Sequence, residues 1–457
     1  MTDEAPDLSS IVKAYDVRGV VPDQLDERIS RALGAAFAKF AGASTVAISY
    51  DMRPSSVPLS EAFGEGVRSQ GVNVIDAGLG STDMLYFASG SMDVPGAMFT
   101  ASHNPAQYNG IKMCRQGAAP IGQESGLVQI RADAESYLVN GEPDHDGPAG
   151  TVESRDILAG YADHLLSLVG LEGIRHLKVV VDAGNGMGGH TAPAVLGRLP
   201  LTIVPLYFEL DGTFPNHEAN PIEPENLHDL QKAVLEHGAD IGLAFDGDAD
   251  RCFVVDERGE IVSPSVLTAL IAARELAKEP GATIIHNLIA SKAVPELVTE
   301  LGGKPVRTRV GHSYIKGTMA ETGAIFGGEH SGHFYFRDFW RADSGMLAAL
   351  HALAALGGQD GPLSGLLAKY SRYAASGEIN SVVKDQGAAL KAVEAEWGSR
   401  PGVELDRLDG LTVSLPDGSW FNLRASNTEP LLRLNAEAND TASMEKLRDE
   451  VLALVRE

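Results

Sequence analysis

The chain is organised around residues 94–112, which read V-P-G-A-M-F-T-A-S-H-N-P-A-Q-Y-N-G-I-K. The apolar run 96–99 predicts a buried strand, and the Asn-Pro pair after it forces a turn. Ser102 is therefore expected to lie exposed at a strand end, with His103 and Lys112 nearby in sequence. A hydroxyl held there among cationic donors suits phosphoryl or acyl transfer. The same turn could serve only to cap a strand, and the rest of the chain decides between the two.

The composition limits the class of protein. A chain of 457 residues is too long for one core, and predicts about three domains, with four plausible. A hydrophobic content of 44% and 50 glycines is typical of an α/β protein with many tight turns. The net charge of −25 argues against sequence-independent binding to nucleic acid and against binding to an anionic membrane surface.

The sequence also bears on the compartment. The first residues, M-T-D-E-A-P-D, are acidic and contain no apolar signal-peptide core. No apolar run reaches the roughly 18 residues that a membrane span needs. Cys114 and Cys252 lie far apart and suggest neither a disulfide framework nor a zinc site. We therefore expect a cytoplasmic protein without a membrane partner.

A weak internal repeat runs through the first three quarters of the chain. In each unit a β-rich strand runs into a helix, at 45–50, 178–182 and 282–286. Later in each unit two strands flank a polar loop, at 96–112, 241–256 and 324–336. Ligands of open α/β sheets bind beyond the carboxyl ends of strands, so three such units facing one cleft would bring these loops together.

Composition shifts divide the chain into four expected domains with mixed sheets. The Gly/Pro/Asp run at 140–150 predicts a linker, a helix is expected at 153–169, and the segment 373–377 predicts a hinge. The last unit looks different, with Asp-Gly turns between short strands and helices at 385–397 and 441–456. The expected domains are three α/β units and one α+β unit, at 1–145, 146–257, 258–370 and 371–457.

The stretch Asp246-Gly-Asp-Ala-Asp-Arg251 spaces three carboxylates by two residues. In an extended segment that spacing places all three on one side. Carboxylate oxygens suit a hard cation, and Mg²⁺ takes few protein ligands together with substrate phosphate. An acidic turn or a Ca²⁺ loop is the alternative, but an EF-hand needs flanking helices, and Asp246 follows a strand. The pattern favours Mg²⁺.

Two further loops carry chemistry. In Gly328-Glu-His-Ser-Gly-His333 a carboxylate could accept two sugar hydroxyls, although a hairpin turn with a buried histidine would read the same way. In the segment 424–430, R-A-S-N-T-E-P, a planar arginine fork stands beside hydroxyl and amide donors. This combination is what phosphate binding needs. A polar hairpin loop is the alternative.

Together, and in this order along the chain, the four motifs resemble the α-D-phosphohexomutase family. The resemblance implies a phosphoryl carrier at Ser102 and a catalytic set of Ser102, His103, Lys112, Arg251 and His312. It implies a Mg²⁺ site formed by Ser102, Asp246, Asp248 and Asp250. It implies substrate-binding residues at Tyr15, Arg18, Glu329, Ser331, His333, Arg424, Ser426, Asn427 and Thr428. His312 and Lys112 are the candidates for the general base and acid.

The family fold is a heart of four domains around a cleft, which agrees with the internal repeat. The form G-E-H-S-G-H resembles the phosphomannomutase/phosphoglucomutase branch, whereas glutamine in place of His330 would resemble phosphoglucosamine mutases. The resemblance implies interconversion of hexose 1- and 6-phosphates, with a hexose 1,6-bisphosphate as activator, by a monomer or homodimer. Phosphoglucosamine mutase, a metal-dependent phosphatase and a non-catalytic sensor are the competing functions. A lysine that the family often carries would fall near Ile289, and Lys292 is the nearest one here.

Overall fold

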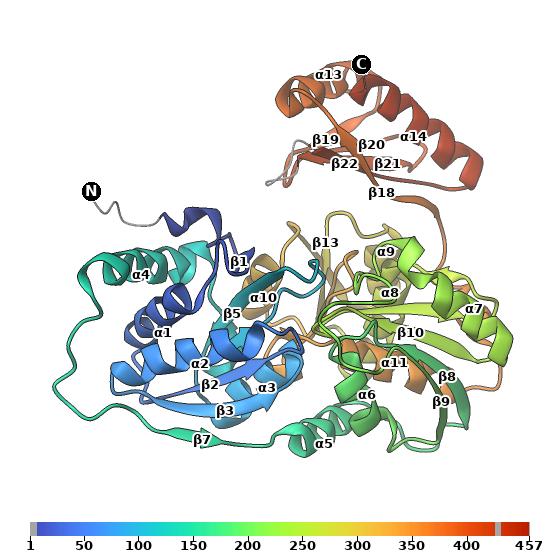
Figure 1. Ribbon diagram of the computed structural model, residues 1–457. Coiled ribbons are helices and arrows are strands. Elements are labelled where there is room, and N and C mark those ends of the chain that lie inside the picture. The colour runs from blue at the N-terminus through green and yellow to red at the C-terminus, as the bar shows by residue number, and fades with distance from the viewer. Residues whose placement is uncertain (1–6, 426–430, 457) are drawn as a thin grey trace.

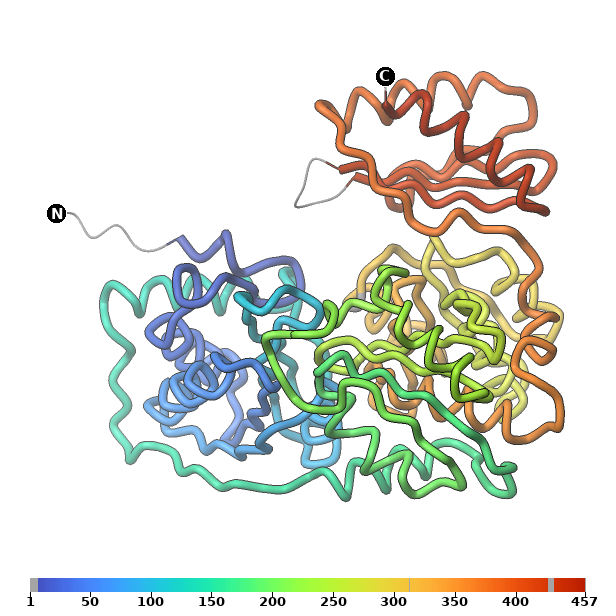
Figure 2. The backbone as a smooth tube through the Cα atoms, turned by 45° about the vertical axis from the view of Figure 1, so that its right-hand side comes forward, coloured from blue at the N-terminus to red at the C-terminus, as the bar shows by residue number. Residues whose placement is uncertain are grey.

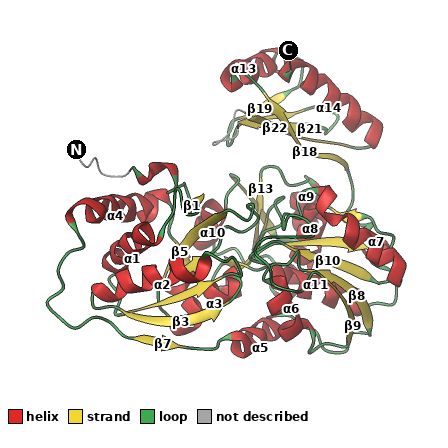
Figure 3. Ribbon diagram, in the orientation of Figure 1, coloured by secondary structure: helices red, strands yellow, loops and turns green. Residues whose placement is uncertain are grey.

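The computed structural model describes residues 7–425 and 431–456. We number the four domains I to IV in chain order. Figure 1 shows domain I on one side, domains II and III together on the other, and domain IV above domain III. The turned view in Figure 2 keeps domain IV apart from domain I. Figure 3 shows helices flanking the sheets.

The first three sheets share one plan. In domain I the parallel strands β4 (Gly96–Phe99), β2 (Thr45–Tyr50) and β3 (Asn73–Leu79) are followed outward from β4 by the antiparallel β5 (Tyr108–Arg115). Domain II repeats this order with β10 (Ile241–Phe245), β8 (Leu177–Asp182), β9 (Leu201–Leu206) and β11 (Cys252–Asp256). Domain III repeats it with β15 (Phe326–Gly328), β13 (Thr283–Asn287), β14 (Lys304–Thr308) and β16 (Phe334–Phe336). The predicted repeat is therefore confirmed, strand by strand.

Shorter strands extend these sheets. They are β1 (Val17–Val20), β6 (Ala119–Pro120) and β7 (Val152–Ser154) in the first, β12 (Ile261–Val262) in the second and β17 (Ala342–Asp343) in the third. The helices of domain I are α1 (Glu27–Ala41), α2 (Ser56–Ser69), α3 (Thr82–Met92) and α4 (Val128–Asn140). Domain II has α5 (Leu158–Leu168), α6 (Gly188–Leu196) and α7 (His228–His237). Domain III has α8 (Pro264–Lys278), α9 (Ala293–Glu300), α10 (His312–Thr322), α11 (Gly345–Gly357) and α12 (Leu363–Leu367).

Domain IV is an antiparallel sheet with two helices among its described residues. The sheet runs in the order β18 (Ala374–Val382), β22 (Leu431–Ala438), β21 (Trp420–Ala425), β20 (Leu411–Ser414) and β19 (Glu404–Asp406). The helices are α13 (Gln386–Gly398) and α14 (Thr441–Val455), as the sequence predicts. The segment predicted as a hinge lies mostly inside β18, with a bulge between Ala375 and Glu378.

Local sequence explains where these elements begin and end. The side chain of Asp26 accepts a hydrogen bond from the amide of Ile29 at the start of α1, and Gly42 ends that helix in the left-handed conformation. Strand β2 is apolar and buried on both faces, as expected for a parallel strand between two layers of helices. One prediction is wrong: the helix expected at 153–169 starts only at Leu158. Residues 152–154 pair instead with β3 as β7, because sheet pairing overrides helix propensity there.

The hydrophobic cores group the domains. The largest cluster of buried apolar residues is continuous through domains I, II and III, and includes Ala47, Val181 and Ile284 from their central strands. Domain IV has a separate core that includes Phe421 and Val451. The first three sheets are therefore held in fixed relation, and their loops can form one site.

Candidate active site

In each repeat the chemistry lies in one equivalent loop, between the third parallel strand and its antiparallel partner. These are the Ser102 loop (100–107), the carboxylate loop (246–251) and the glutamate loop (329–333). The hydroxyl of Ser102 donates to Asp246 Oδ2 at 2.8 Å, which joins the first two. An isolated antiparallel β-bridge between the backbones of Arg251 and His333 joins the second loop to the third. The structure thus brings the three loops together, as the sequence predicts.

The Ser102 side chain is buried rather than exposed, because the loops of the other domains pack over it. It is 4% exposed and adopts a positive φ of 51°. Its Oγ lies 3.2 Å from Nδ1 of His103. A Cβ at position 247 would meet the carbonyl oxygen of Ser102 at 2.3 Å, so glycine is required there. The serine is held against the carboxylate loop by a close backbone approach.

The three aspartates converge by a turn and not by an extended segment, which corrects the geometric argument from the sequence. Ala249 has a φ of 58°, and ligand atoms of Asp246, Asp248 and Asp250 lie within 4.8 Å of one another. Oδ1 of Asp248 and Oδ1 of Asp250 are buried without a hydrogen-bond partner among the described residues. Buried carboxylate oxygens that accept no hydrogen bond fit a divalent cation.

Lys112 offsets part of this negative charge. Its Nζ donates to Asp248 Oδ2 at 2.7 Å and to Asp250 Oδ2 at 2.6 Å. Burial alone would lower the pKa of Lys112, but the two carboxylates outweigh it and raise that pKa. Burial, followed by the charge of Asp248, raises the pKa of Asp250 to about 7. The three aspartates therefore carry more negative charge than their contacts with the protein neutralise, and this excess favours a bound cation.

Arg251 and His103 place donors beside the serine. Nε of Arg251 donates to Asp246 Oδ2 at 2.8 Å, while its Nη2 is buried without a hydrogen-bond partner among the described residues. Burial, and then the cation of Arg251, lowers the pKa of His103 well below its ordinary value. A buried guanidinium with a free donor fits a phosphoryl oxygen.

The glutamate loop contributes Glu329, Ser331 and His333. The carboxylate of Glu329 accepts the hydroxyl of Tyr335 at 2.6 Å and the amide of Gly311 at 3.1 Å. This carboxylate is therefore fixed in place by groups of the protein. Ser331 and His333 line the second of two neighbouring cavities described below.

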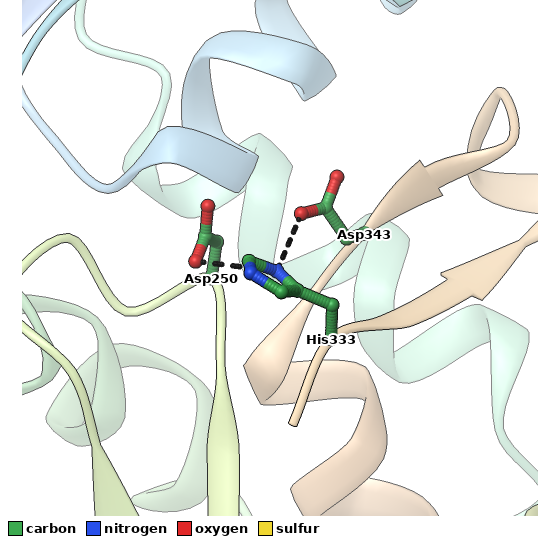
Figure 4. Close-up of side chains that lie close together, drawn as sticks. All are labelled: Asp250, His333 and Asp343. Carbon is green, nitrogen blue, oxygen red and sulfur yellow. Dashed lines mark hydrogen bonds and ion pairs between the residues drawn. The ribbon is translucent and has the colours of Figure 1, made fainter. Parts of the chain in front are cut away.

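Figure 4 shows His333 between Asp250 and Asp343. Its Nδ1 lies 3.0 Å from Asp343 Oδ2 and 3.6 Å from Asp250 Oδ1. Lys316 holds the other oxygen of Asp343 at 2.8 Å. Burial would lower the pKa of His333, but Asp250 and Asp343 raise it. Asp343 therefore fixes the orientation of this ring.

Two cavities meet at the Ser102 loop, and Ser102 itself lines the first of them. The first, of about 700 Å³, is lined from domains I to III and includes Tyr15, Arg18 and Lys112. The second, of about 830 Å³, opens toward domain IV and includes Arg433. Both are lined by His103 and His333, so they meet at the reacting centre. Arg18 donates to Asn104 Oδ1 at 2.5 Å, and burial raises the pKa of Tyr15 to about 12.

Part of the predicted set lies elsewhere or outside the described residues. Arg424 is the penultimate residue of β21, and its guanidinium lies 3.8 Å from both Glu378 and Asp409. Lys292 donates to the carbonyl of Gly418 at 2.6 Å and lies over the ring of Tyr373, so it contacts domain IV rather than either cavity. The residues outside the description are Ser426, Asn427 and Thr428, together with the side chain of His312, which begins α10.

Sequence reasoning missed three residues that support the site. Arg53 donates to carbonyls of the Ser102 loop, and Thr82 donates to Asp248. Asp343 orients His333. Of these, Arg53 carried a faint signal, since a charged residue directly after a buried strand lies at the ligand-binding edge of the sheet. Thr82 and Asp343 gave none.

Comparison with known proteins agrees with this geometry. Models of the phosphoglucomutase/phosphomannomutase family match alpha/beta/alpha domain I at residues 9–137, domain II at 159–259, domain III at 264–373 and the C-terminal domain at 378–454. Fold and site define a mutase, an enzyme of the isomerase class. The chain belongs to the phosphoglucomutase/phosphomannomutase family.

Individual relatives cover nearly the whole chain. A protein of Xanthomonas campestris named "Phosphohexose mutases" is 42% identical over 97% of this chain and 98% of its own length. A phosphomannomutase of Salmonella montevideo is 41% identical, with the same coverage. The crystal structure of a phosphoglucomutase/phosphomannomutase family protein from Burkholderia thailandensis superposes with a TM-score of 0.87, at 33% identity, and covers 98% and 97% of the two chains.

The helices of the described residues bear on whether the chain could span a membrane. None of them is both long enough and apolar enough to cross a bilayer.

Proposed function

We propose that this enzyme interconverts hexose 1-phosphates and hexose 6-phosphates, with mannose phosphates first and glucose phosphates second, through a phosphoserine at Ser102. The observation that carries the proposal is the hydrogen bond from Ser102 to Asp246, inside a buried carboxylate trio beside two substrate-sized cavities. The relatives named phosphomannomutase support the choice of sugar. So does the form G-E-H-S-G-H of the glutamate loop.

The residues would act mainly through charge and position. A phosphoryl group on Ser102 brings close to two negative charges into a buried site. Arg251 and Lys112 offset that charge from either side of the carboxylate loop. Mg²⁺ held by Ser102 and the three aspartates would supply a Lewis acid that draws charge from the transferring phosphoryl group. Positioning and electrostatic stabilisation provide most of the rate in such transfers.

The phosphoryl group would pass from Ser102 to a hydroxyl of the sugar phosphate. A sugar hydroxyl attacks phosphorus, the bond to Ser102 Oγ breaks, and Oγ takes up the proton that the hydroxyl loses. The product is a hexose 1,6-bisphosphate, which turns round and returns its other phosphoryl group to Ser102. Such a bisphosphate also activates unphosphorylated enzyme by the same step. His312 and Lys112 stay our candidates for moving the proton.

Substrate contacts lie on the other side of the cavities. Ser331 and His333 line the second cavity, where they would meet the sugar, and Tyr15 and Arg18 line the first. Glu329 is buried and lines neither cavity, so its role in sugar binding is supported by the resemblance of the glutamate loop alone. Arg424, with Ser426, Asn427 and Thr428, would hold the phosphate that does not react.

A direct assay tests this proposal. Mannose, glucose, glucosamine and N-acetylglucosamine 1-phosphates are supplied in turn, each with its bisphosphate in catalytic amount, and the 6-phosphate is measured. We expect the highest kcat/KM with mannose or glucose, and no turnover in Ser102→Ala. A highest value with glucosamine 1-phosphate would assign the enzyme to phosphoglucosamine mutases instead.

A further inference from the structure

The guanidinium of Arg53 binds three backbone carbonyls of the Ser102 loop and a fourth at the start of β5. Arg53 follows β2, and its side chain is fully buried. Nη2 donates to the carbonyls of Ser102 at 2.9 Å and Asn104 at 2.7 Å. Nη1 donates to the carbonyls of Pro105 at 2.9 Å and Tyr108 at 3.0 Å. The backbone from 102 to 108 therefore wraps around one buried cation.

This loop needs external support. The positive φ of Ser102 places a residue with a Cβ in the left-handed region, which L residues other than glycine, asparagine and aspartate rarely occupy. Such a conformation persists where the surroundings over-determine it. The amide of Ser102 donates to Thr100 Oγ1 at 2.8 Å from one side, and Arg53 holds the carbonyl from the other. Both the amide and the carbonyl of Ser102 are thus bound.

Arg53 is itself held from two domains. Its Nε lies 3.3 Å from Asp51 Oδ2, and the other oxygen of Asp51 accepts the hydroxyl of Ser56 at 2.6 Å. The guanidinium carbon lies 5.0 Å from the ring centroid of Phe214, which belongs to domain II. A planar cation between a carboxylate and an aromatic face has little freedom to move.

We propose that Arg53 is a positioning residue that sets the place of Ser102 Oγ relative to Asp246. This role of Arg53 depends on the proposed function only for the identity of the group that Ser102 transfers. Arg53 contacts the loop backbone and lines neither described cavity, so its loss should change the rate of transfer and not the binding of substrate. Lysine keeps the charge but has a single nitrogen, which cannot span four carbonyls.

The test compares Arg53→Lys with Arg68→Lys. Arg68 is a matched control in the same domain, because its Nε also donates to one backbone carbonyl, that of Gly150 at 2.7 Å, far from the serine in the fold. We expect kcat to fall about a hundredfold in Arg53→Lys, the loss that a misplacement of about 1 Å can cause, with KM within about twofold. Arg68→Lys should match the wild type.

Two further readouts separate positioning from general stability. The rate at which hexose bisphosphate phosphorylates Ser102, followed by intact mass, should fall in step with kcat. Hydrogen exchange at the amides of 102–108 should quicken in Arg53→Lys and not in Arg68→Lys. The milder variant Phe214→Leu loosens the guanidinium from domain II and should lower kcat in the same direction, which keeps the test open if Arg53→Lys does not fold.

Each outcome has one meaning. A raised KM with unchanged kcat would make Arg53 a binding residue and overturn the proposal. Lower melting temperature with unchanged kcat, phosphorylation rate and loop exchange would make it merely structural, and would overturn it as well. Wild-type enzyme that never acquires phosphate on Ser102 would instead refute the proposed function, and the exchange data would still test the hold of Arg53 on the loop.

Discussion

The hydroxyl of Thr82, at the start of α3 in domain I, donates to Oδ2 of Asp248 in domain II at 2.5 Å. The backbone amide of Thr82 also donates to the carbonyl of Asp248 at 3.0 Å. Since Lys112 donates to the same Oδ2, the hydrogen bonds of this carboxylate gather on one oxygen. Oδ1 has no hydrogen-bond partner among the described residues, so a residue of one domain sets the orientation of a carboxylate in another that we propose as a metal ligand.

We predict that Thr82→Val weakens Mg²⁺ binding. The substitution keeps the shape of the side chain and removes the donor that orients Asp248, and loss of such a supporting contact typically costs about 10- to 100-fold in metal affinity. Calorimetric titration of chelator-treated protein with Mg²⁺ measures this affinity. The control variant Thr82→Ser keeps the hydroxyl, and its affinity for Mg²⁺ should stay near that of the wild type. Equal affinities in the Thr82→Val variant and the wild type would show that Lys112 alone orients the carboxylate.

Ser102→Ala should abolish both turnover and phosphorylation of the protein. Ser102 Oγ donates to Asp246 and is the proposed phosphoryl carrier, so the substitution removes the oxygen that would accept the phosphoryl group. Intact-mass analysis of freshly purified wild type should show some phosphorylated species, absent from the variant. Ser331→Ala, across the cleft, should keep that species. Full turnover in Ser102→Ala would refute the assignment.

Arg424→Ala should weaken 1-phosphate and 6-phosphate substrates alike. The bisphosphate of the proposed mechanism would bind in two opposite orientations, and in each its distal phosphate would rest on this guanidinium, whose ion-pair partners among the described residues lie at 3.8 Å. The expected loss in kcat/KM is about 2–3 kcal/mol, the scale of a charge-assisted contact. Phosphorylation of Ser102 should survive.

The matched control for that measurement is Arg448→Ala, on α14 of the same domain, where the arginine pairs only with its neighbour Asp449 among the described residues. The measurement is kcat/KM for both variants, with the 1-phosphate and with the 6-phosphate as substrate. Unchanged kcat/KM in Arg424→Ala would mean that the segment 424–430 is a turn without a role in binding.

Asp83 should make the folded protein less stable as pH rises from about 4 to 6. It is buried where three domains meet, and accepts hydrogen bonds from Tyr161 at 2.7 Å and Ser344 at 2.6 Å. Burial raises its pKa from 3.8 to about 6, against the opposing effect of these hydrogen bonds. The folded state therefore binds the proton more tightly than the unfolded state. The contribution of Asp83 to the free energy of unfolding is fully present below pH 3.8 and is lost as the pH rises through 6. The total loss in the free energy of unfolding is about 3 kcal/mol.

Unfolding free energies of wild type and Asp83→Asn, measured from about pH 4 to 7, test this sign. The variant does not ionise at this position, so the difference between the two proteins should shift in favour of the variant as pH rises, and level off above about pH 6. Curves that stay parallel over that range would show that Asp83 titrates normally.

The sequence predicted the repeat and its reactive loops because both are local signals. A buried strand that ends in a polar turn is visible in a few consecutive residues, and Ser102 and Asp246 each sit in such a turn. Thr82 was invisible because its partner lies 166 residues away. The burial of Ser102 escaped prediction for the same reason, since the covering loops come from other domains. The helix expected at 153–169 failed because pairing with a distant strand decided its first residues.

The division of the hydrophobic core has a consequence for how the enzyme is lost and regained. Domains I to III share the largest core cluster, and domain I also has a second cluster of its own that includes Phe37 and Phe99. Elements that share a core tend to open as one cooperative unit. Damage to any of these three domains should therefore disable the serine, the carboxylates and the glutamate together. Domain IV has its own core, so it can melt and re-form while the other three stay folded. Arg424 thus sits on the part of the enzyme that local unfolding could withdraw from the site while the reacting centre stays assembled.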